Sequence, residues 1–286
     1  MKKEKEKVVS YWERKQYGAN WFSFFAEYIM RSITGKKNYS PLVWALETHV
    51  PSLPLNNILE IGCLRGKKLF YLLSSGFAVN GHGTDIAEAA VRDAEKSSIE
   101  KNLQERASFS VLDLNHPALP PATFDAVISN GVLHHIRNLE ACVKNIYDSL
   151  NPGGYLFASE YIGPNRFRYT EKEIQAINEA IKMLPDDLAN GPYNPARWQK
   201  TLELDPSEAV RPEDITDTLF SVFDDVTIKP YGGTILRNAT SKKLFKNFEE
   251  NNPIHKNAVI NLIEYEKKLL SHGLHSHYAY FAALKK

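Results

Sequence analysis

Two glycines lie where a strand pattern changes into a helix pattern. The first of them follows an acidic residue by two positions. In "ILEIGCLRGKKLFYLLSSG", residues 58–76, an apolar run containing Glu60 leads through Gly62 and Gly66 into a stretch that closes at Gly76. A strand, a glycine turn and a helix build the nucleotide pocket of several unrelated enzyme families. These residue types therefore predict a site for a nucleotide-containing ligand at this turn.

Two of those pockets do not match the spacing. A P-loop has four residues between its glycines and then Lys with Ser or Thr. Here Gly62 and Gly66 enclose three residues, and Lys68 stands where a magnesium-binding hydroxyl is needed. A dinucleotide fingerprint needs glycine at the positions that Leu64 and Lys67 occupy. The sequence predicts neither a P-loop nor a dinucleotide site.

The third pattern is met. Glu60, Gly62 and Gly66 resemble the first motif of the class I S-adenosylmethionine-dependent methyltransferases, written [DE]-x-G-x-G-x-G, with Leu64 in place of the middle glycine. Asp85 ends the next predicted strand, near the offset of about 20 residues at which an acid bonds ribose hydroxyls. The resemblance implies S-adenosylmethionine as the cofactor.

Three further stretches carry the resemblance over residues 58–160. Asp113 lies in "VLDL", where the superfamily typically has an acid or amide near the adenine amino group. "FDAVISNGVLHHI" is similar to its fourth-strand motif, and "LNPGGYLFASE" to the L-x-P-G-G turn before its fifth strand. The cofactor contacts that the resemblance implies are Glu60, Gly62, Cys63, Gly66, Asp85, Ile86, Asp113, Leu114 and Asn130.

Strand and helix patterns alternate around these motifs. The predicted strands are "NNILEIG", "FAVNGHGTD", "ASFSVLDL", "FDAVISNG" and "YLFASEYIG", most of them separated by helical segments. Such alternation predicts right-handed crossovers and a doubly wound α/β fold with a parallel sheet covered on both faces. "FDDVTIKPYGGTIL" and "HYAYFAALKK" predict two more strands, which would complete a Rossmann-like, seven-stranded methyltransferase sheet.

Four parts are expected along the chain. They are a helical cap at 1–50, the cofactor-binding core at 51–160, an insertion at 161–212, and residues 213–286, which complete the sheet and carry a helical segment. The insertion follows a strand end, where ligands bind in such sheets, and is predicted to cap the substrate. Residues 8–33 form an aromatic amphipathic pattern that is expected to close over the acceptor with the insertion, and 242–271 is expected to lie apart from both.

Composition narrows the function classes. Thirty-five Lys and Arg against 34 Asp and Glu leave a net charge of +1, so no nucleic-acid partner is expected. No run is long and apolar enough for stable membrane insertion, and a cytoplasmic protein is predicted. Cys63 and Cys142 are too few for a disulfide framework and lack a second cysteine at zinc-site spacing.

Candidate catalytic residues follow the fourth and fifth predicted strands. Methyl transfer is a displacement at carbon, in which the protein mainly aligns the reactants, and a general base is required only for a protonated acceptor. The candidates are His134, His135 and Glu160. Histidines that pack at a helix start, and a solvated strand end, are the alternatives. Asn130 is expected near the sulfonium, with a simple strand cap as its alternative.

Residues predicted to contact the acceptor come from the aromatic N-terminal region and from the start of the insertion. They are Tyr11, Tyr17, Trp21, Tyr161 and Arg166. Three histidines in "SHGLHSHY" have the residue type of metal ligands, but no cysteine or nearby carboxylate completes a set. A turn, and no metal, is predicted there.

The expected function is methyl transfer from S-adenosylmethionine to a small-molecule or glycan-type acceptor. Two alternatives remain open. The aromatic N-terminal helix is also compatible with an interfacial anchor, in which case the acceptor is a lipid. A non-catalytic partner of another enzyme would bind S-adenosylmethionine without turnover. The sequence predicts neither the methylated atom nor the oligomeric state.

Overall fold

The computed structural model describes residues 2–14 and 23–286, with the side chains of 2–3, 12–14 and 23–24 left aside. Its centre is a seven-stranded sheet in the order β3-β2-β1-β4-β5-β7-β6, in which β7 runs antiparallel to both neighbours. The strands are β1 (Leu55–Ile61), β2 (Ala78–Asp85), β3 (Ala107–Val111), β4 (Phe124–Asn130), β5 (Leu150–Tyr161), β6 (Asp225–Gly232) and β7 (Tyr278–Leu284). The predicted fold class is confirmed.

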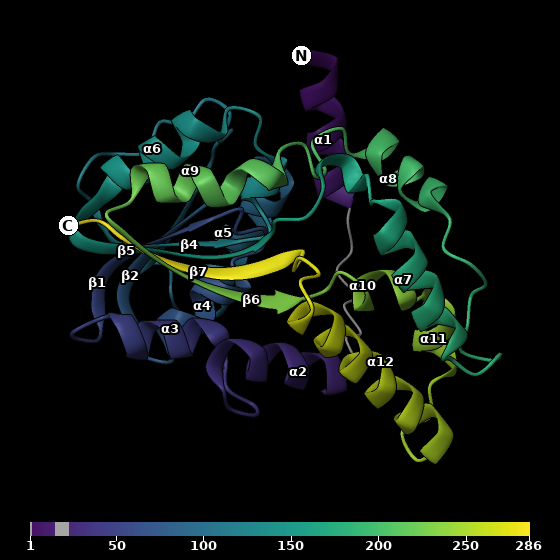
Figure 1. Ribbon diagram of the computed structural model, residues 1–286. Helices are drawn as coiled ribbons and strands as arrows, with labels where there is room; N and C mark the ends of the chain where they lie inside the picture. The colour runs from purple at the N-terminus through teal and green to yellow at the C-terminus, as the bar shows by residue number, and fades with distance from the viewer. Residues whose placement is uncertain (1, 15–22) are drawn as a thin grey trace.

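The helices cover the sheet and one of its edges (Figure 1). They are α1 (Lys2–Arg14), α2 (Ser23–Thr34), α3 (Pro41–His49), α4 (Lys67–Ser74), α5 (Glu88–Glu100), α6 (Leu139–Ser149), α7 (Glu171–Lys182), α8 (Gln199–Leu204), α9 (Ile215–Val222), α10 (Leu236–Ala239), α11 (Lys242–Asn247) and α12 (Pro253–Ser271). Short 3-10 turns are η1 (Leu133–His135), η2 (Asn165–Phe167), η3 (Pro195–Trp198) and η4 (Pro212–Asp214). No helix in the described ranges is both long and apolar enough to cross a bilayer.

Both faces of the sheet are buried because neighbouring residues of a strand point to opposite sides. In β1, Ile58 packs with α3 and α4, whereas Leu59 packs with α6 and α9. The same alternation places Ile128 of β4 against the first set of helices and Val127 against the second. Continuous apolar runs of this kind are typical of a central parallel strand, and they bring the carboxyl ends of β1, β2 and β4 to one edge.

A second hydrophobic cluster forms a helical cap beside the sheet. It joins Ile177 and Ile181 of α7 to Leu236 of α10, Leu244 of α11 and Leu262 of α12. Residues 242–271 thus pack against the insertion at 161–212, and the expectation that they lie apart from it is wrong. The reason is that apolar side chains at helical spacing in the two segments pack together in one hydrophobic core. The predicted boundary at residue 213 stays a prediction.

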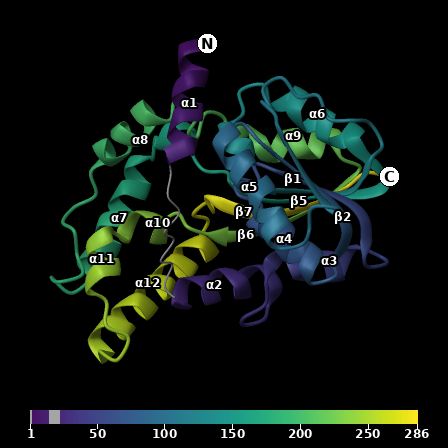
Figure 2. The ribbon, with the colours of Figure 1, turned by 180° about the vertical axis from the view of Figure 1, so that it is seen from behind.

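The N-terminal region does not act as one helix. α1 contacts α5 and α8, whereas α2 packs on β6, α3 and α12 (Figure 2). Residues 15–22, which include the predicted acceptor contacts Tyr17 and Trp21, lie outside the described residues. Of the two described helices α1 and α2, α1 is therefore the one that lies near the strand ends where the cofactor site was predicted.

Candidate active site

The turn between β1 and α4 is built on two glycines with left-handed backbone. Gly62 has φ +60°, and a Cβ there would come within 2.4 Å of Val132 Cγ2. Gly66 has φ +68°, and its Cβ would meet the Phe109 ring at 2.9 Å. Gly62 is therefore required where the loop approaches the β4 end, and Gly66 where the helix approaches β3.

Leu64 departs from the motif in a way that the backbone explains. Its φ is +49°, a conformation that favours glycine, so the turn keeps the shape of the glycine-rich motif without the glycine. The Leu64 amide donates a 2.8 Å hydrogen bond to Asp85 Oδ2. This bond ties the turn to the end of β2 and stabilises the left-handed residue.

Glu60 supports the turn from below. Its Oε2 accepts a 3.0 Å hydrogen bond from the Leu69 amide in α4, and burial raises the pKa of this carboxyl to about 7 against the opposing effect of Lys68. Glu60, Cys63 and Gly66 do not line the cavity described below. Of the predicted cofactor residues, these three shape the turn from outside the cavity wall.

Asp85 lies at the carboxyl end of β2 with both carboxylate oxygens in use. Oδ2 accepts the Leu64 amide and Oδ1 accepts the Ala87 amide at 2.9 Å. Burial raises the pKa of Asp85, and these amide hydrogen bonds oppose that shift. Each oxygen keeps a second lone pair, so the carboxylate can still accept hydroxyl hydrogen bonds from a ligand in the cavity that it lines.

A cavity of about 600 Å³ opens at the carboxyl ends of these strands, within the range of small-molecule sites. Its wall contains the predicted cofactor residues Gly62, Asp85, Ile86, Asp113, Leu114 and Asn130. It also contains residues that no motif indicated, among them Glu4, Lys5, Val8 and Ser207. The sheet thus brings predicted residues at the ends of four strands, β1 to β4, into one cavity.

The first helix closes one side of this cavity. Lys5 Nζ lies 2.7 Å from Asp113 Oδ2, and Glu4 pairs with Arg137. Burial would raise the pKa of Asp113, but Lys5 and the Asn115 amide hold it below its ordinary value. α1 is therefore held over the cavity by ion pairs that a ligand near Asp113 would meet.

His134 is the centre of a buried charge network. Its Nδ1 lies 2.9 Å from Glu160 Oε2, and its Nε2 lies 3.5 Å from Glu208 Oε1. Burial would lower the pKa of His134, but the two carboxylates raise it to about 9. Because both ring nitrogens face carboxylates, the imidazolium form is favoured, and it can neither accept a proton nor bind a metal.

Glu160 anchors the turn after β4. Its Oε1 accepts hydrogen bonds from Ser129 Oγ at 2.8 Å, the Val132 amide at 3.0 Å and the Leu133 amide at 3.1 Å. Its side chain is fully buried and does not line the cavity. Glu160 therefore holds the turn that leads into η1, and its predicted catalytic role stays a prediction.

His135, unlike His134, lines the cavity. Its Nδ1 lies 3.0 Å from Ser207 Oγ and 3.6 Å from Asp205 Oδ2, both on the insertion. A histidine oriented by a hydroxyl and a carboxylate is suited to accept a proton from a nearby group. Of the two predicted histidines, only His135 lines the described cavity, and its catalytic role stays a prediction.

The predicted acceptor contacts are divided between two places. Burial and the negative charges of Glu208 and Asp205 raise the pKa of Tyr11. Tyr161 is buried, and its hydroxyl donates to the Pro164 carbonyl at 3.1 Å. Arg166 donates from Nη1 to the Glu208 carbonyl at 2.9 Å. These three contacts remain predictions.

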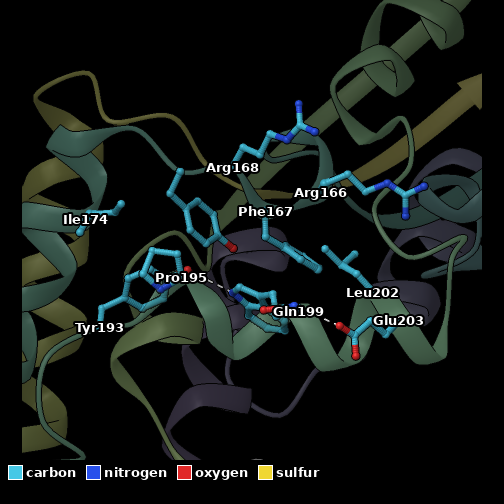
Figure 3. Close-up of a pocket in the computed structure, with 11 residues that line it drawn as sticks. Arg166, Phe167, Arg168, Ile174, Tyr193, Pro195, Gln199, Leu202 and Glu203 are labelled. Atoms are coloured by element: carbon cyan, nitrogen blue, oxygen red, sulfur yellow. Dashed lines mark hydrogen bonds between the residues drawn. The ribbon is translucent and has the colours of Figure 1, made fainter.

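A second cavity of about 390 Å³ lies in the helical cap (Figure 3). Aromatic rings of Phe167, Tyr193 and Trp198 form much of its wall, and Arg166 and Arg168 lie at its border. Trp198 stacks on Phe167 with ring centroids 4.2 Å apart. The insertion therefore carries an aromatic surface separate from the cavity at the strand ends.

The C-terminal histidines do not come together. His277 Nε2 pairs with Glu173 Oε1 at 2.7 Å in the interior, and His272 Nδ1 bonds the Lys268 carbonyl at 2.7 Å on the surface. Within the described residues, the three histidines form no group with metal-ligand spacing. The carboxylate that pairs with His277 comes from α7, so no local spacing in the sequence indicated it.

Comparison with known proteins supports the predicted family for the central part of the chain. A sequence profile described as "Methyltransferase domain" matches residues 59–156, which hold the β1 turn, the ends of β2 and β4, and η1. Residues 59–156 thus hold a methyltransferase domain, which supports the resemblance to the class I S-adenosylmethionine-dependent methyltransferases. The family predicted from Glu60, Gly62 and Gly66, and with it the class of cofactor, is confirmed.

The curated relatives are distant in sequence. Phosphoethanolamine N-methyltransferase 3 of Arabidopsis thaliana is 24% identical over 204 residues, which are 66% of this chain and 41% of that protein. Highly reducing polyketide synthase 2 of Gibberella zeae is 31% identical over 126 residues, 39% of this chain and 5% of that protein. The chain therefore spans less than half the length of these curated relatives.

Solved structures share the fold of this chain. Phosphoethanolamine N-methyltransferase 2 of Haemonchus contortus, crystallised with S-adenosyl-L-methionine, has a TM-score of 0.55 at 18% identity and covers 97% of this chain and 60% of its own. The [4+2]-cyclase SpnF has a TM-score of 0.51 at 16% identity and covers 85% of this chain and 79% of its own. Since a cyclase has this fold, the fold alone does not define the reaction.

Proposed function

We propose that this protein transfers the methyl group of S-adenosylmethionine to a small-molecule acceptor. The observation that carries the proposal is the single cavity in which Gly62, Asp85, Asp113 and Asn130 meet at the strand ends. When bound, the cofactor supplies an electrophilic methyl group, which an acceptor atom attacks in line while the carbon–sulfur electron pair returns to sulfur.

The residues of the cavity have separate roles in this proposal. The Asp85 carboxylate accepts hydrogen bonds from the ribose hydroxyls of the cofactor. Gly62 lets the loop backbone approach the methionine portion. Asn130 at the end of β4 lies toward the reacting methyl group. Where the acceptor carries a proton, His135 accepts it, since this side chain lines the cavity and His134 is held as an imidazolium.

A small acceptor is supported by the names of the relatives. Phosphoethanolamine names the acceptor of two of them, and geranyl diphosphate names that of a neighbour with TM-score 0.51. A glycan-type acceptor stays within the proposal, as does a cytoplasmic location.

Mass spectrometry can identify the product. The protein is incubated with methyl-labelled S-adenosylmethionine and a cell extract, and the extract is then searched for labelled compounds. The absence of a labelled product in every extract would favour the non-catalytic alternative.

Binding of the cofactor is the first expected result. Calorimetry should show one site per chain for S-adenosylmethionine or S-adenosylhomocysteine, with a dissociation constant on the order of micromolar, because a preformed cavity and a buried acid receive the ligand. A flat titration with both ligands on folded protein would remove the cofactor assignment.

Ordering of α1 is the second expected result. Lys5 and Val8 line the cavity, so backbone amides of residues 4–11 should exchange more slowly when S-adenosylhomocysteine is bound. Residues 205–211, which bring Ser207 to the same wall, should also be protected. α2 packs elsewhere and serves as the internal control. Unchanged exchange in 4–11 at saturating ligand would mean that α1 does not cover the bound cofactor.

A further inference from the structure

One arginine in the helical cap has no anionic partner among the described residues. Arg237 lies on α10, between the end of β6 and α7 (Figure 1). Its Nε is buried and has no hydrogen-bond partner. In the described part of the chain, no carboxylate oxygen lies within 4.0 Å of its guanidinium nitrogens. A largely desolvated charge is thus left to be neutralised by something else.

Aromatic rings hold this guanidinium in place. Its Cζ lies 4.9 Å from the Trp198 ring centroid, 5.6 Å from Tyr278 and 5.8 Å from Phe167. Ring faces attract a cation, but they accept none of its N–H hydrogen bonds in the manner of an oxygen. Three rings from η2, η3 and β7 therefore orient a planar donor group and leave its hydrogen-bonding capacity for an oxyanion.

Among the described side chains, we find no unpaired carboxylate beside Arg237. Glu208, the carboxylate whose charge reaches Arg237, is already paired with His134. Among the residues whose side chains lie outside the description, the sequence contains one carboxylate, Glu13. Arg197, the next cation in the cluster, donates a 2.8 Å hydrogen bond from Nη1 to the Asn238 carbonyl. The cluster is cationic, and none of the acids with described side chains supplies the missing anion.

A line of side chains connects this cation to the cofactor cavity. Tyr278 stacks on Tyr231 with centroids 5.7 Å apart, and the Tyr231 hydroxyl lies 2.9 Å from Ser159 Oγ. Ser159 pairs in the sheet with Asn130, which lines the cavity. Arg237 thus lies at the far end of a row of packed side chains that begins beside Asn130, where the methyl group is proposed to react.

We propose that Arg237 binds an anionic group of the methyl acceptor, a carboxylate or a phosphate, and so selects acceptors that carry such a group. The proposal rests on the proposed function, because it assigns the acceptor end of that site. The fork of guanidinium donors suits both oxyanions, and the surrounding rings exclude water, which strengthens the pairing.

Fluorine NMR of the chain labelled with 5-fluorotryptophan tests the proposal, since Trp198 lies against the guanidinium. Trp198→Phe identifies the Trp198 signal. The protein, saturated with S-adenosylhomocysteine, is titrated with inorganic phosphate and separately with benzoate at constant ionic strength. We expect at least one probe to shift the Trp198 signal saturably. A response to phosphate alone assigns a phosphate group, one to benzoate alone a carboxylate, and a response to both their shared oxyanion chemistry.

Arg237→Met should abolish this shift, and Arg237→Lys should weaken binding of the active probe at least fivefold, because it keeps the charge and loses the fork. Arg92→Met is the matched control, since Arg92 is exposed on α5 and pairs with Glu88. If Arg237→Met does not fold, the lysine variant decides. A Trp198 signal that neither probe moves, or equal shifts in wild type and the Arg237 variants, would overturn the proposal.

Calorimetry with S-adenosylhomocysteine on the same samples separates this proposal from the proposed function. Arg237→Met is expected to bind S-adenosylhomocysteine as the parent does, because Arg237 does not line the cofactor cavity. If the parent does not bind S-adenosylhomocysteine, the proposed function is contradicted. If the parent binds it but shows no anion response, only the role of Arg237 is contradicted.

Discussion

Replacing His134 by glutamine is expected to lower the free energy of unfolding by about 3–5 kcal/mol at pH 7. The imidazolium lies between Glu160 and Glu208, both of which are buried. Glutamine can donate to one carboxylate but carries no charge. The variant therefore leaves two buried carboxylates without their cation, which is the costly way to break a buried ion pair. Urea unfolding monitored by circular dichroism measures the loss.

The pH dependence gives a second readout of the same network. The carboxylates raise the pKa of His134 in the folded protein to about 9, against 6.5 for an ordinary histidine. Its contribution to stability is complete below pH 6.5 and is lost as the pH rises through 9. Glu60, with a pKa raised to about 7, gives a similar loss at lower pH, so the interval from 7 to 9 isolates His134.

The wild-type free energy of unfolding should therefore fall between pH 7 and 9, and this fall should be much smaller in His134→Gln. His275→Gln, an exposed histidine before β7, is the matched control and should stay within about 0.5 kcal/mol of the parent. A His134→Gln variant as stable as the control, or one that keeps the parent's slope from pH 7 to 9, would show that His134 is not charged in the fold.

Replacing Asp85 by alanine is expected to weaken cofactor binding at least tenfold. In the proposed complex its carboxylate accepts ribose hydroxyls, and each hydrogen bond to a charged group contributes about 1.5–3 kcal/mol before water compensates. The variant also removes the acceptor of the Leu64 and Ala87 amides, which hold the turn against β2. Both effects act in the same direction, and calorimetry with S-adenosylhomocysteine measures their sum.

Two variants separate these effects. Asp85→Asn keeps one carbonyl acceptor for the turn and loses the charge, so it should bind more tightly than the alanine variant and less tightly than the parent. Asp93→Ala, an exposed aspartate on α5 that pairs with Arg65, should bind as the parent does. An Asp85→Ala protein that keeps its fold and its full affinity would mean that the end of β2 does not contact the cofactor.

The sequence by itself determined the sheet and the cofactor side of the site. Apolar runs in β1 and β4 and the glycine turn at Gly62 are local patterns, and parallel strands separated by helices place their carboxyl ends at one edge. The positions of Asp85, Asp113 and Asn130 in one cavity follow from that topology. Residues that lie at strand ends could therefore be named from the strand pattern together with the resemblance to the methyltransferase motifs.

Only the tertiary structure decided which residues meet across the sheet edge. Lys5 reaches Asp113, Glu208 reaches His134, and Arg237 lies among rings from η2, η3 and β7. These partners come from elements that lie far apart in the sequence. Their contacts depend on how the cap packs against the sheet. No periodicity or motif encodes such a contact, because its energy arises from burial and charge pairing that exist only after the chain has folded.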